Sequence, residues 1–367
     1  MECVDLLCIC MQKISVEKTK GVGSCNRVGH AAAARQAPGC SQYKCAAQGT
    51  AEFAIIAPMS EHNDCPDGSC ATRGPSPFAN TPPIGLPPEL QDKGDELVDW
   101  KKIAPDLHED AYATADALWW ARHLGESTAR GEDVITLLRG PDDARAVQRA
   151  LAQAYHWWPA DRAPRYWKSG GPSMDKLVHA PLPEPGVHLN LDVAPAPQTV
   201  FQLRGAEAEI AFRVGSEVTL QAAQALDDAA AWALIDAWCI SLEWVDVRWR
   251  EGLKAPALAQ LADGQCHGGL SLGAWQPVER LQGVDWAQQQ CTITLNGEAP
   301  QTFTGSHSLG SPAALLRAWL VHVAEQYGSV PAGTVVTTGT WCGCMQLAAG
   351  TRFHAEFAGL GALTWQF

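Results

Sequence analysis

The sequence predicts an α+β fold in which a rolled or sandwiched β-sheet follows a smaller helical part. Three observations support this expectation. Segments with strand patterns outnumber segments with helical periodicity, and the two kinds do not alternate regularly as they do in a doubly wound fold. Gly and Pro also punctuate the strands, as at Asn296-Gly297. The 367 residues allow one large domain or two.

The first hundred residues differ in composition from the rest of the chain. Eight of the 13 cysteines lie before residue 71, whereas all 15 Trp lie at or after Trp100. Three Cys-x4-Cys pairs leave a zinc site as an alternative, but they lack the usual x2 spacing and His partners. We interpret residues 1–58 as a disordered extension, or as sequence from a start codon placed before Met59. The Pro-rich residues 59–105 are interpreted as a linker.

Charge and hydropathy exclude several classes of protein. The formal net charge of −13 argues against nucleic acid or an anionic membrane surface as the main partner. The chain has no run of about 18 apolar residues, so we expect no membrane span. Its first residues include acids where an export signal has basic residues, and we therefore expect a cytoplasmic protein.

Four segments have apolar residues at helical spacing. They are Asp110–His123, Pro141–Trp158, Leu220–Ala237 and Ser311–Tyr327. The second begins with Pro and two acids in its first turn, which is a favourable start. In the last segment Ser311-Pro312 supplies the N-cap and first helical position, and Gly328 supplies the stop.

The strand patterns lie mostly in the second half of the chain. The expected strands are Glu209–Val214, Ile240–Trp249, Gly269–Trp275, Cys291–Leu295, Thr334–Thr338, Thr351–Phe357 and Ala362–Phe367. We therefore expect one catalytic domain at 106–367, with a helical part at 106–190 and a β-rich, metal-binding part at 191–367.

Three glutamates within these strands suggest a metal site. Glu207 and Glu209 would point to the same face of a strand, roughly 7 Å apart. Like charges placed side by side are costly, and a shared cation would relieve that cost. Glu243 adds a third carboxylate inside an apolar, Trp-rich strand. An oxygen-only set suits Mg²⁺ or Mn²⁺, while the simpler alternative is a solvated strand edge.

Four segments resemble a known family in their order and spacing. They are GAEAEIAFRVG at 205–215, LEWVDVR at 242–248, GTVVTTGTWCG at 333–343 and FAGLG at 357–361. The family is the fumarylacetoacetate hydrolase superfamily, and the 2-hydroxypenta-2,4-dienoate (2-keto-4-pentenoate) hydratase branch is the most similar. The resemblance covers about 106–367 and implies a mixed β-roll or sandwich of that type. It also implies that Glu207, Glu209 and Glu243 bind one divalent cation.

The resemblance implies a lysine ahead of the metal strand. The segment RYWKSGGPS at 165–173 stands in that place, so Lys168 matches the family's lysine. Lys168 would neutralise the substrate carboxylate or pass a proton. Ser169, Gly170 and Gly171 are then expected to bind substrate, since backbone without side chains can approach a ligand closely.

Two further segments differ from the family pattern around the expected pocket. In ADGQCHGG, at 262–269, we expect Asp263 and His267 to act in catalysis and Gln265 to bind substrate. In GTWCG, Thr340 is expected to bind substrate. His307 is a weaker acid/base candidate, because a lone His is more often a structural hydrogen-bonding group.

Together these features imply a metal-dependent, hydratase-type lyase acting on a 2-oxo or 2-hydroxydienoate acid. The acid would chelate the cation, and the cation would stabilise an enolate at C2. Decarboxylation and C–C hydrolysis are alternatives within the superfamily, and a non-catalytic relative that binds small acids is an alternative outside enzyme chemistry. The expected partner is a small-molecule 2-oxo acid, and we expect a homo-oligomer.

Overall fold

The computed structural model describes residues 98–125, 127, 129–159, 162–189, 193–195 and 202–367, which all belong to one compact unit. Residues 1–58, interpreted above as an extension, lie outside the described residues. So do all but the last residues of the expected linker. No helix in the described part of the chain is long and apolar enough to cross a membrane.

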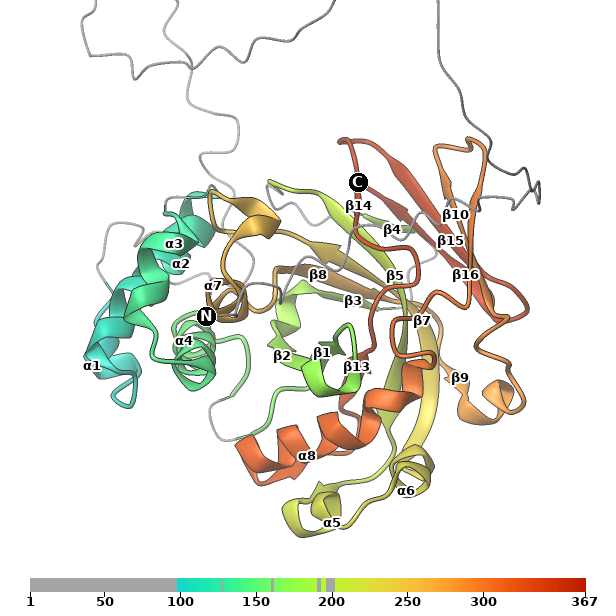
Figure 1. The fold of residues 1–367 in the computed structure, drawn as a ribbon, viewed down its shortest axis with the longest axis horizontal. Coiled ribbons are helices and arrows are strands. Elements are labelled where there is room, and N and C mark those ends of the chain that lie inside the picture. The colour runs from blue at the N-terminus through green and yellow to red at the C-terminus, as the bar shows by residue number, and fades with distance from the viewer. Residues whose placement is uncertain (1–97, 126, 128, 160–161, 190–192, 196–201) are drawn as a thin grey trace, which may run out of the picture. The chain divides into compact units, whose positions relative to one another are not determined.

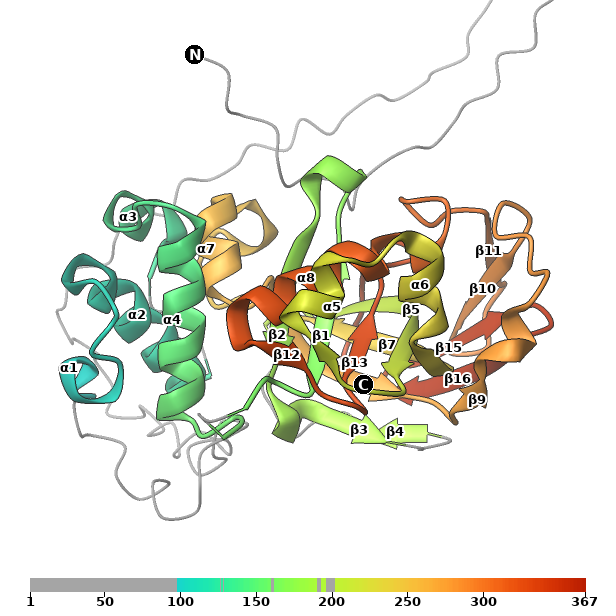
Figure 2. The ribbon, with the colours of Figure 1, turned by 90° about the horizontal axis from the view of Figure 1, so that it is seen from below.

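The helical part gathers on one side of the molecule's main sheet (Figures 1 and 2). It contains α1 (Trp100–Ile103), α2 (Tyr112–Leu124), α3 (Gly131–Val134), α4 (Pro141–Ala154) and two 3-10 turns, Glu109–Ala111 and Ile135–Leu137. Helix α7 (Ala257–Ala262) arrives from the second half of the chain and packs on α4. These helices share one hydrophobic cluster, which includes Trp100, Leu118, Leu151 and Trp249.

The main sheet has nine strands, seven of which follow the order β2-β1-β13-β5-β7-β8-β3. Their bounds are β1 (Tyr166–Gly170), β2 (Val178–Leu182), β3 (Val187–Leu189), β5 (Gly205–Val214), β7 (Ile235–Val245), β8 (His267–Leu272) and β13 (Val335–Thr337). Strands β9 (Gln276–Pro277) and β14 (Met345–Gln346) pair beside this path with β7 and β5. The pairs β1–β13 and β3–β8 are parallel, and the other pairs are antiparallel.

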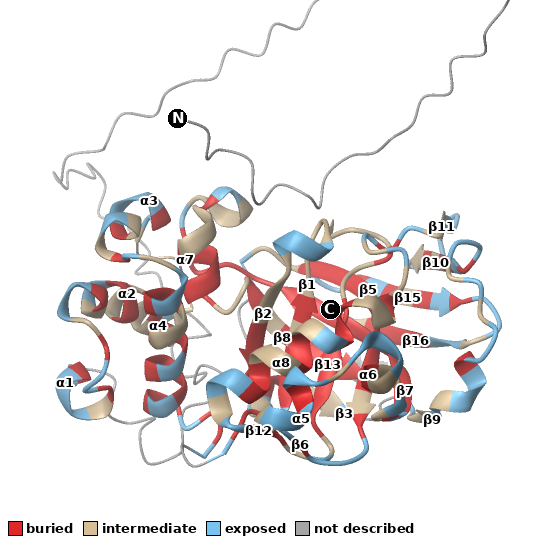
Figure 3. Ribbon diagram, turned by 60° about the horizontal axis from the view of Figure 1, so that its bottom comes forward, coloured by how far each residue is buried: buried red, intermediate tan, exposed pale blue. Residues whose placement is uncertain are grey.

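A second sheet covers part of the first. It has the order β11-β10-β15-β16-β4, with bounds Gln301–Thr304, Gln290–Leu295, Arg352–Phe357, Gly361–Gln366 and Val193–Pro195. Buried side chains of both sheets and of α8 (Leu316–Tyr327) form the largest hydrophobic cluster. Figure 3 shows this buried core running through the central strands. The remaining elements are α5 (Leu220–Gln224), α6 (Asp228–Ala233), the pair β6 (Val218–Thr219) and β12 (Ser329–Val330), and short 3-10 turns.

The α+β prediction with two packed sheets and a helical N-terminal part is confirmed. All seven expected strands are present, with ends shifted by a few residues. One expected helix, Leu220–Ala237, is wrong as a single element. The side chain of Asp227 accepts a hydrogen bond from the backbone N–H of Ala230 at 2.7 Å, and it thereby caps a second helix, α6.

Two expected boundaries also need correction. The described structure begins inside the expected linker, where Trp100 is buried and its Nε1 donates to Asp116 Oδ1 at 2.5 Å. The folded part therefore includes α1. The region 106–190 is not wholly helical, because β1, β2 and β3 lie within it and join the main sheet. These strands are short, and β1 and β3 also pair with β13 and β8 far along the sequence, so local periodicity gives little sign of them.

Candidate metal centre

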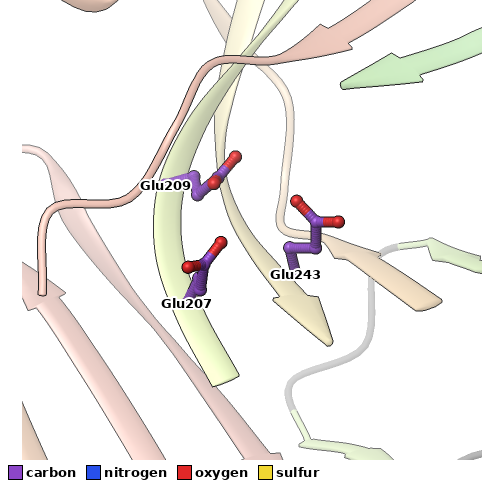
Figure 4. Close-up of side chains that lie close together, drawn as sticks. All are labelled: Glu207, Glu209 and Glu243. Carbon is purple, nitrogen blue, oxygen red and sulfur yellow. The ribbon is translucent and has the colours of Figure 1, made fainter. Parts of the chain in front are cut away.

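Three glutamates meet where β5 and β7 pair near the middle of the main sheet. Glu207 and Glu209 lie on β5, and the antiparallel register places Glu207 directly opposite Glu243 of β7. One carboxylate oxygen of each residue lies within 4.8 Å of the others (Figure 4). All three residues are buried, with exposed fractions of 8%, 1% and 1%. The alternative of a solvated strand edge is therefore wrong.

The electrostatics of the cluster favour a cation. Burial, followed by the charges of Glu243 and Glu207, raises the pKa of Glu209 to about 8. Burial acts in the same direction on Glu243, but the charge of Lys168 and a hydrogen bond from His267 outweigh it and lower the pKa of Glu243. A divalent cation would offset the repulsion among the three carboxylates and let all three ionise.

Two hydroxyl groups hold Glu209 in place. Thr337 of β13 donates from Oγ1 to Glu209 Oε2. Ser241 Oγ lies 2.8 Å from Thr337 Oγ1, and since the Thr337 proton is used by Glu209, Ser241 donates to Thr337. Both hydroxyl-bearing residues are buried. This chain crosses three strands and fixes the rotamer of one carboxylate, as supporting hydrogen bonds do in metal sites.

Lys168 lies at the centre, as the sequence predicts. Its Nζ donates to Glu243 Oε1 at 2.5 Å and to the backbone carbonyl of Gln265 at 2.9 Å. Burial disfavours the charged amine, but the carboxylates of Glu243 and Glu207 outweigh that effect and raise the pKa of Lys168. Lys168 is therefore a fixed positive charge. Gln265, whose φ is +56°, contributes its carbonyl oxygen through an unusual backbone conformation.

His267 also lies at the centre. Its Nδ1 lies 3.0 Å from Glu243 Oε1, and its Nε2 has no hydrogen-bond partner among the described residues. The carboxylate can only accept, so Nδ1 carries the proton of the neutral ring. Burial lowers the pKa of His267, and the hydrogen bond to Glu243 opposes this shift. The neutral tautomer therefore presents an acceptor at Nε2.

Asp263 is not free to act as an acid or base, contrary to the sequence-based expectation. Arg248 donates to its two oxygens from Nε at 2.5 Å and from the backbone N–H at 3.0 Å, and Arg122 Nη2 donates at 3.1 Å. Arg248 Nη2 also donates to the His267 carbonyl at 2.7 Å. Asp263 therefore fixes the arginine that holds the backbone of His267, which is a positioning role.

Ser169 and Gly171, which follow Lys168, do not face the carboxylates. Successive side chains of a strand alternate between faces, so Ser169 points away from Lys168's face and its Oγ lies 2.8 Å from His179 Nδ1. A Cβ on Gly171 would lie 2.3 Å from the carbonyl oxygen of Lys176, so the close approach there is to the protein's own turn. Gly170 packs beside Gly339 at ordinary distance. The substrate-binding roles expected for these three residues gain no support from the geometry.

Thr340 and His307 also make local contacts. Thr340 Oγ1 donates to the carbonyl of Gly343 at 3.2 Å and so closes its own turn. His307 donates from Nε2 to the carbonyl of Thr338 at 2.8 Å, and its Nδ1 accepts from the backbone N–H of Leu309 at 3.3 Å. Both ring nitrogens are used, and burial lowers the pKa of His307. His307 is therefore a structural hydrogen-bonding residue.

Sequence reasoning missed four residues that support the centre: Ser241, Thr337, Arg122 and Arg248. The alternation of the expected strands gives a partial signal for Ser241, which is two residues from Glu243. Arg248 lies 3.8 Å from Asp246, its neighbour on the same strand pattern, but Asp263 is its nearer partner at 2.5 Å. Arg122 lies on a helix 141 positions from Asp263, and no local pattern indicates such a contact.

Comparisons with known proteins show which family model, sequence and solved structures this chain is similar to. Residues 190–367 match the family model described as fumarylacetoacetate (FAA) hydrolase, C-terminal. A 4-oxalocrotonate decarboxylase from Pseudomonas sp is 25% identical over 253 residues, which cover 67% of this chain and 95% of the relative. Two crystal structures of 4-oxalocrotonate decarboxylase from Pseudomonas putida G7 each match with a TM-score of 0.59, covering 71% of this chain and 97% of theirs. One is complexed with calcium and acetate at 18% identity, and the other with magnesium and adipate at 19%.

Proposed function

We propose that the protein, whose residues 190–367 match the fumarylacetoacetate hydrolase C-terminal family model, is a divalent-cation-dependent lyase acting on a 2-oxo or 2-hydroxydienoate acid. The observation that carries this proposal is the cluster of Glu207, Glu209 and Glu243, buried beside Lys168 and His267. Cytoplasmic location and homo-oligomeric assembly stay predictions from the sequence.

The donor set fits Mg²⁺ or Mn²⁺. All three ligands are hard carboxylate oxygens, and the nearest sulfur group, the Cys342 thiol, has its pKa raised to about 12 by burial and is no thiolate. Burial and the neighbouring carboxylates raise the pKa of Glu209, so a bound cation would favour its ionised form. When bound, the cation supplies Lewis-acid stabilisation for negative charge developing at the C2 oxygen of the acid.

The protein's own residues would bind and orient the acid. Lys168 supplies a fixed positive charge that an anionic substrate needs in a chain of net charge −13. His267 donates from Nδ1 to Glu243 and so helps to orient that carboxylate. Thr337 and Ser241 keep Glu209 in a binding rotamer.

Hydration is the reaction that we favour, because it is the reaction of the family branch that the sequence motifs of this chain resemble most. Decarboxylation is the second candidate. It needs only the electron sink at C2 and an unsaturated 2-oxo acid with a second carboxylate. The 25% identical relative that bears the name 4-oxalocrotonate decarboxylase favours it. C–C hydrolysis ranks below both.

A metal titration tests the cation site. Chelator-treated protein should gain thermal stability on adding Mn²⁺, by about 2.7 kcal/mol when Mn²⁺ is present at roughly 100 times its Kd. Glu207→Gln and Glu243→Gln should abolish that gain. Glu298→Gln, on an exposed loop, is the matched control and should keep it. A Glu207 or Glu243 variant with the full Mn²⁺ response would remove that residue from the ligand set.

Product analysis tests the reaction. The Mn²⁺-loaded protein is incubated with 2-hydroxypenta-2,4-dienoate and, separately, with an unsaturated 2-oxo diacid. Hydration adds the mass of one water to the first acid, whereas decarboxylation releases CO₂ from the second. Two smaller carbon fragments from a 1,3-diketo acid would instead indicate C–C hydrolysis. Binding of all these acids without any product would support the non-catalytic alternative.

A further inference from the structure

A small cavity lies where the helical part meets β2 and the connection between β7 and β8. Its lining includes Arg122 of α2, Gln148 and Leu151 of α4, Trp157, and His267 of β8. The cavity is water-sized, so it is too small for an organic acid.

Two buried polar atoms from this lining lack partners. Neither Nε2 of His267 nor Nε of Arg122 has a hydrogen-bond partner within the described part of the chain. The side chain of His267 is only 4% exposed. A buried polar atom without a partner costs about 1–3 kcal/mol, so two beside one cavity call for a common ligand.

The chemistry of the two atoms defines that ligand. Nδ1 of His267 donates to Glu243, so Nε2 is an acceptor and needs a donor. Nε of Arg122 is a donor and needs an acceptor. A carboxylate or a metal ion satisfies only one of the two, whereas water satisfies both.

Arg122 is held rigidly in a pose that suits this role. Its Nη2 donates to Asp263 at 3.1 Å, and its guanidinium lies 5.0 Å from the centre of the Trp157 ring. These two contacts leave Nε for another partner.

We propose that the cavity binds one water molecule, which accepts a hydrogen bond from Arg122 Nε–H and donates one to His267 Nε2. Through this water Arg122, which belongs to the helical part, is a positioning residue for the His267 ring and hence for Glu243. The proposal depends on no step of the proposed reaction.

The first test is a high-resolution crystal structure of the full chain loaded with Mn²⁺. We expect an ordered water within hydrogen-bond distance of both Arg122 Nε and His267 Nε2. An empty cavity, a cavity closed by a side chain, or a water that contacts neither nitrogen would overturn the proposal.

The second test separates positioning from general stability. Ala262→Val narrows the lining without touching either nitrogen, and it should displace the water. We expect the imidazole nitrogen resonance of Nε2, measured by ¹⁵N NMR, to move toward that of an acceptor without a hydrogen bond. Mn²⁺ affinity should fall by up to about tenfold, the scale seen when a group supporting a metal ligand is lost. Arg122→Gln should act in the same direction.

Arg149→Gln is the matched control, because Arg149 is an exposed residue of α4 whose Nη1 donates to Gln326 Oε1 at 3.4 Å. It should change neither the resonance nor the affinity. If the Arg122 variant does not fold, the Ala262 variant decides alone. An unchanged Nε2 resonance in folded Ala262→Val protein that has lost the water would show that the water does not bind His267. If neither the wild-type protein nor any variant binds Mn²⁺, the proposed cation site is wrong. The crystal structure and the Nε2 resonance still test the water site in that case.

Discussion

The charges of Lys168 and the three glutamates shift one another's pKa values. Lys168 Nζ contacts Glu243 directly, and this contact lowers the pKa of that carboxyl while Glu209 keeps a raised one. A buried pair of this kind adds little net stability but is costly to break by removing one partner. We therefore expect replacement of Lys168 to affect activity more than the pair itself contributes to the stability of the fold.

Substitution Lys168→Met keeps most of the stem's packing and removes the charge. We expect Mn²⁺ binding to persist, because none of the three carboxylates is changed. We expect kcat/KM to fall on the order of 10²-fold or more, the scale of a lost charge-stabilising or proton-transfer group. Lys176→Met, on an exposed turn, is the control for loss of a lysine. Activity of Lys168→Met within about threefold of wild type would rule out both roles.

The Thr337 hydroxyl donates to Glu209, and Thr337→Val removes it at nearly constant volume. Without this donor the Glu209 carboxylate loses its fixed rotamer, so Mn²⁺ affinity should fall roughly 10-fold or more. Calorimetric titration of chelator-treated protein measures this directly. Thr292→Val, in the second sheet, removes a hydroxyl paired with Thr302 and should leave the affinity unchanged. Equal affinities for the two variants would contradict a supporting role for Thr337.

At the scale of elements, the pairing of β5 with β7 decides which carboxylates meet. The register sets Glu207 opposite Glu243 and Glu209 opposite Ser241. A slip of one residue would turn Glu243 to the other face of the sheet and break the cluster. Strand β13 pairs with β5 on its other side and brings Thr337 to Glu209. The centre is thus built on paired strands, which hold side chains more rigidly than loops do.

The contact between α8 and strands β1 and β2 contains two buried histidines. The rings of His179 (β2) and His322 (α8) are 4.7 Å apart. Burial, then the neighbouring His322 and Arg145, lowers the pKa of His179 to about 3. Burial also lowers the pKa of His322 to about 4. Both rings are therefore neutral in the folded protein at moderately acidic pH, where the unfolded chain takes up protons.

The lowered histidine pKa values make the free energy of unfolding depend on pH. Above pH 6.5, the pKa of histidine in the unfolded chain, the protein keeps its full stability, and it loses stability as the pH falls from 6.5 toward 3. For His179 alone the loss at pH 5 amounts to about 2 kcal/mol relative to pH 8. Denaturant unfolding at the two pH values measures it. In His179→Gln the difference between pH 8 and pH 5 should shrink by about that amount, whereas exposed His108→Gln should leave it unchanged. An identical difference in wild type and His179→Gln would contradict this account.

At the scale of the whole molecule, the described residues contain their own hydrophobic cores. One cluster lies between the two sheets and α8, and another lies among α1–α4 and α7. Residues 1–58 contain none of the 15 Trp. The core therefore does not depend on these residues for its large aromatic side chains.

Deleting residues 1–58 should leave the thermal midpoint and the Mn²⁺ response unchanged within error. A second truncation, which begins at Ala104, removes buried Trp100 and should lower the midpoint clearly, because loss of a buried Trp side chain costs about 3–5 kcal/mol. Differential scanning calorimetry of both truncations measures the effect. A drop of several degrees for the first truncation, or zinc that co-purifies only with full-length protein, would contradict the prediction.

The sequence by itself determined the α+β class, seven of the sixteen strands among the described residues, and the identity of the three carboxylates, Lys168 and His267. These depend on side-chain alternation, turn residues and recognisable short segments, which are local. Only the tertiary structure decided that Ser169 contacts His179 on the other face of the strand, that Thr340 closes its own turn, and that Asp263 pairs with Arg122 from a helix 141 positions away. Such contacts depend on how distant elements pack, and the free energy of a buried hydrogen bond or ion pair depends on partners that no local pattern specifies.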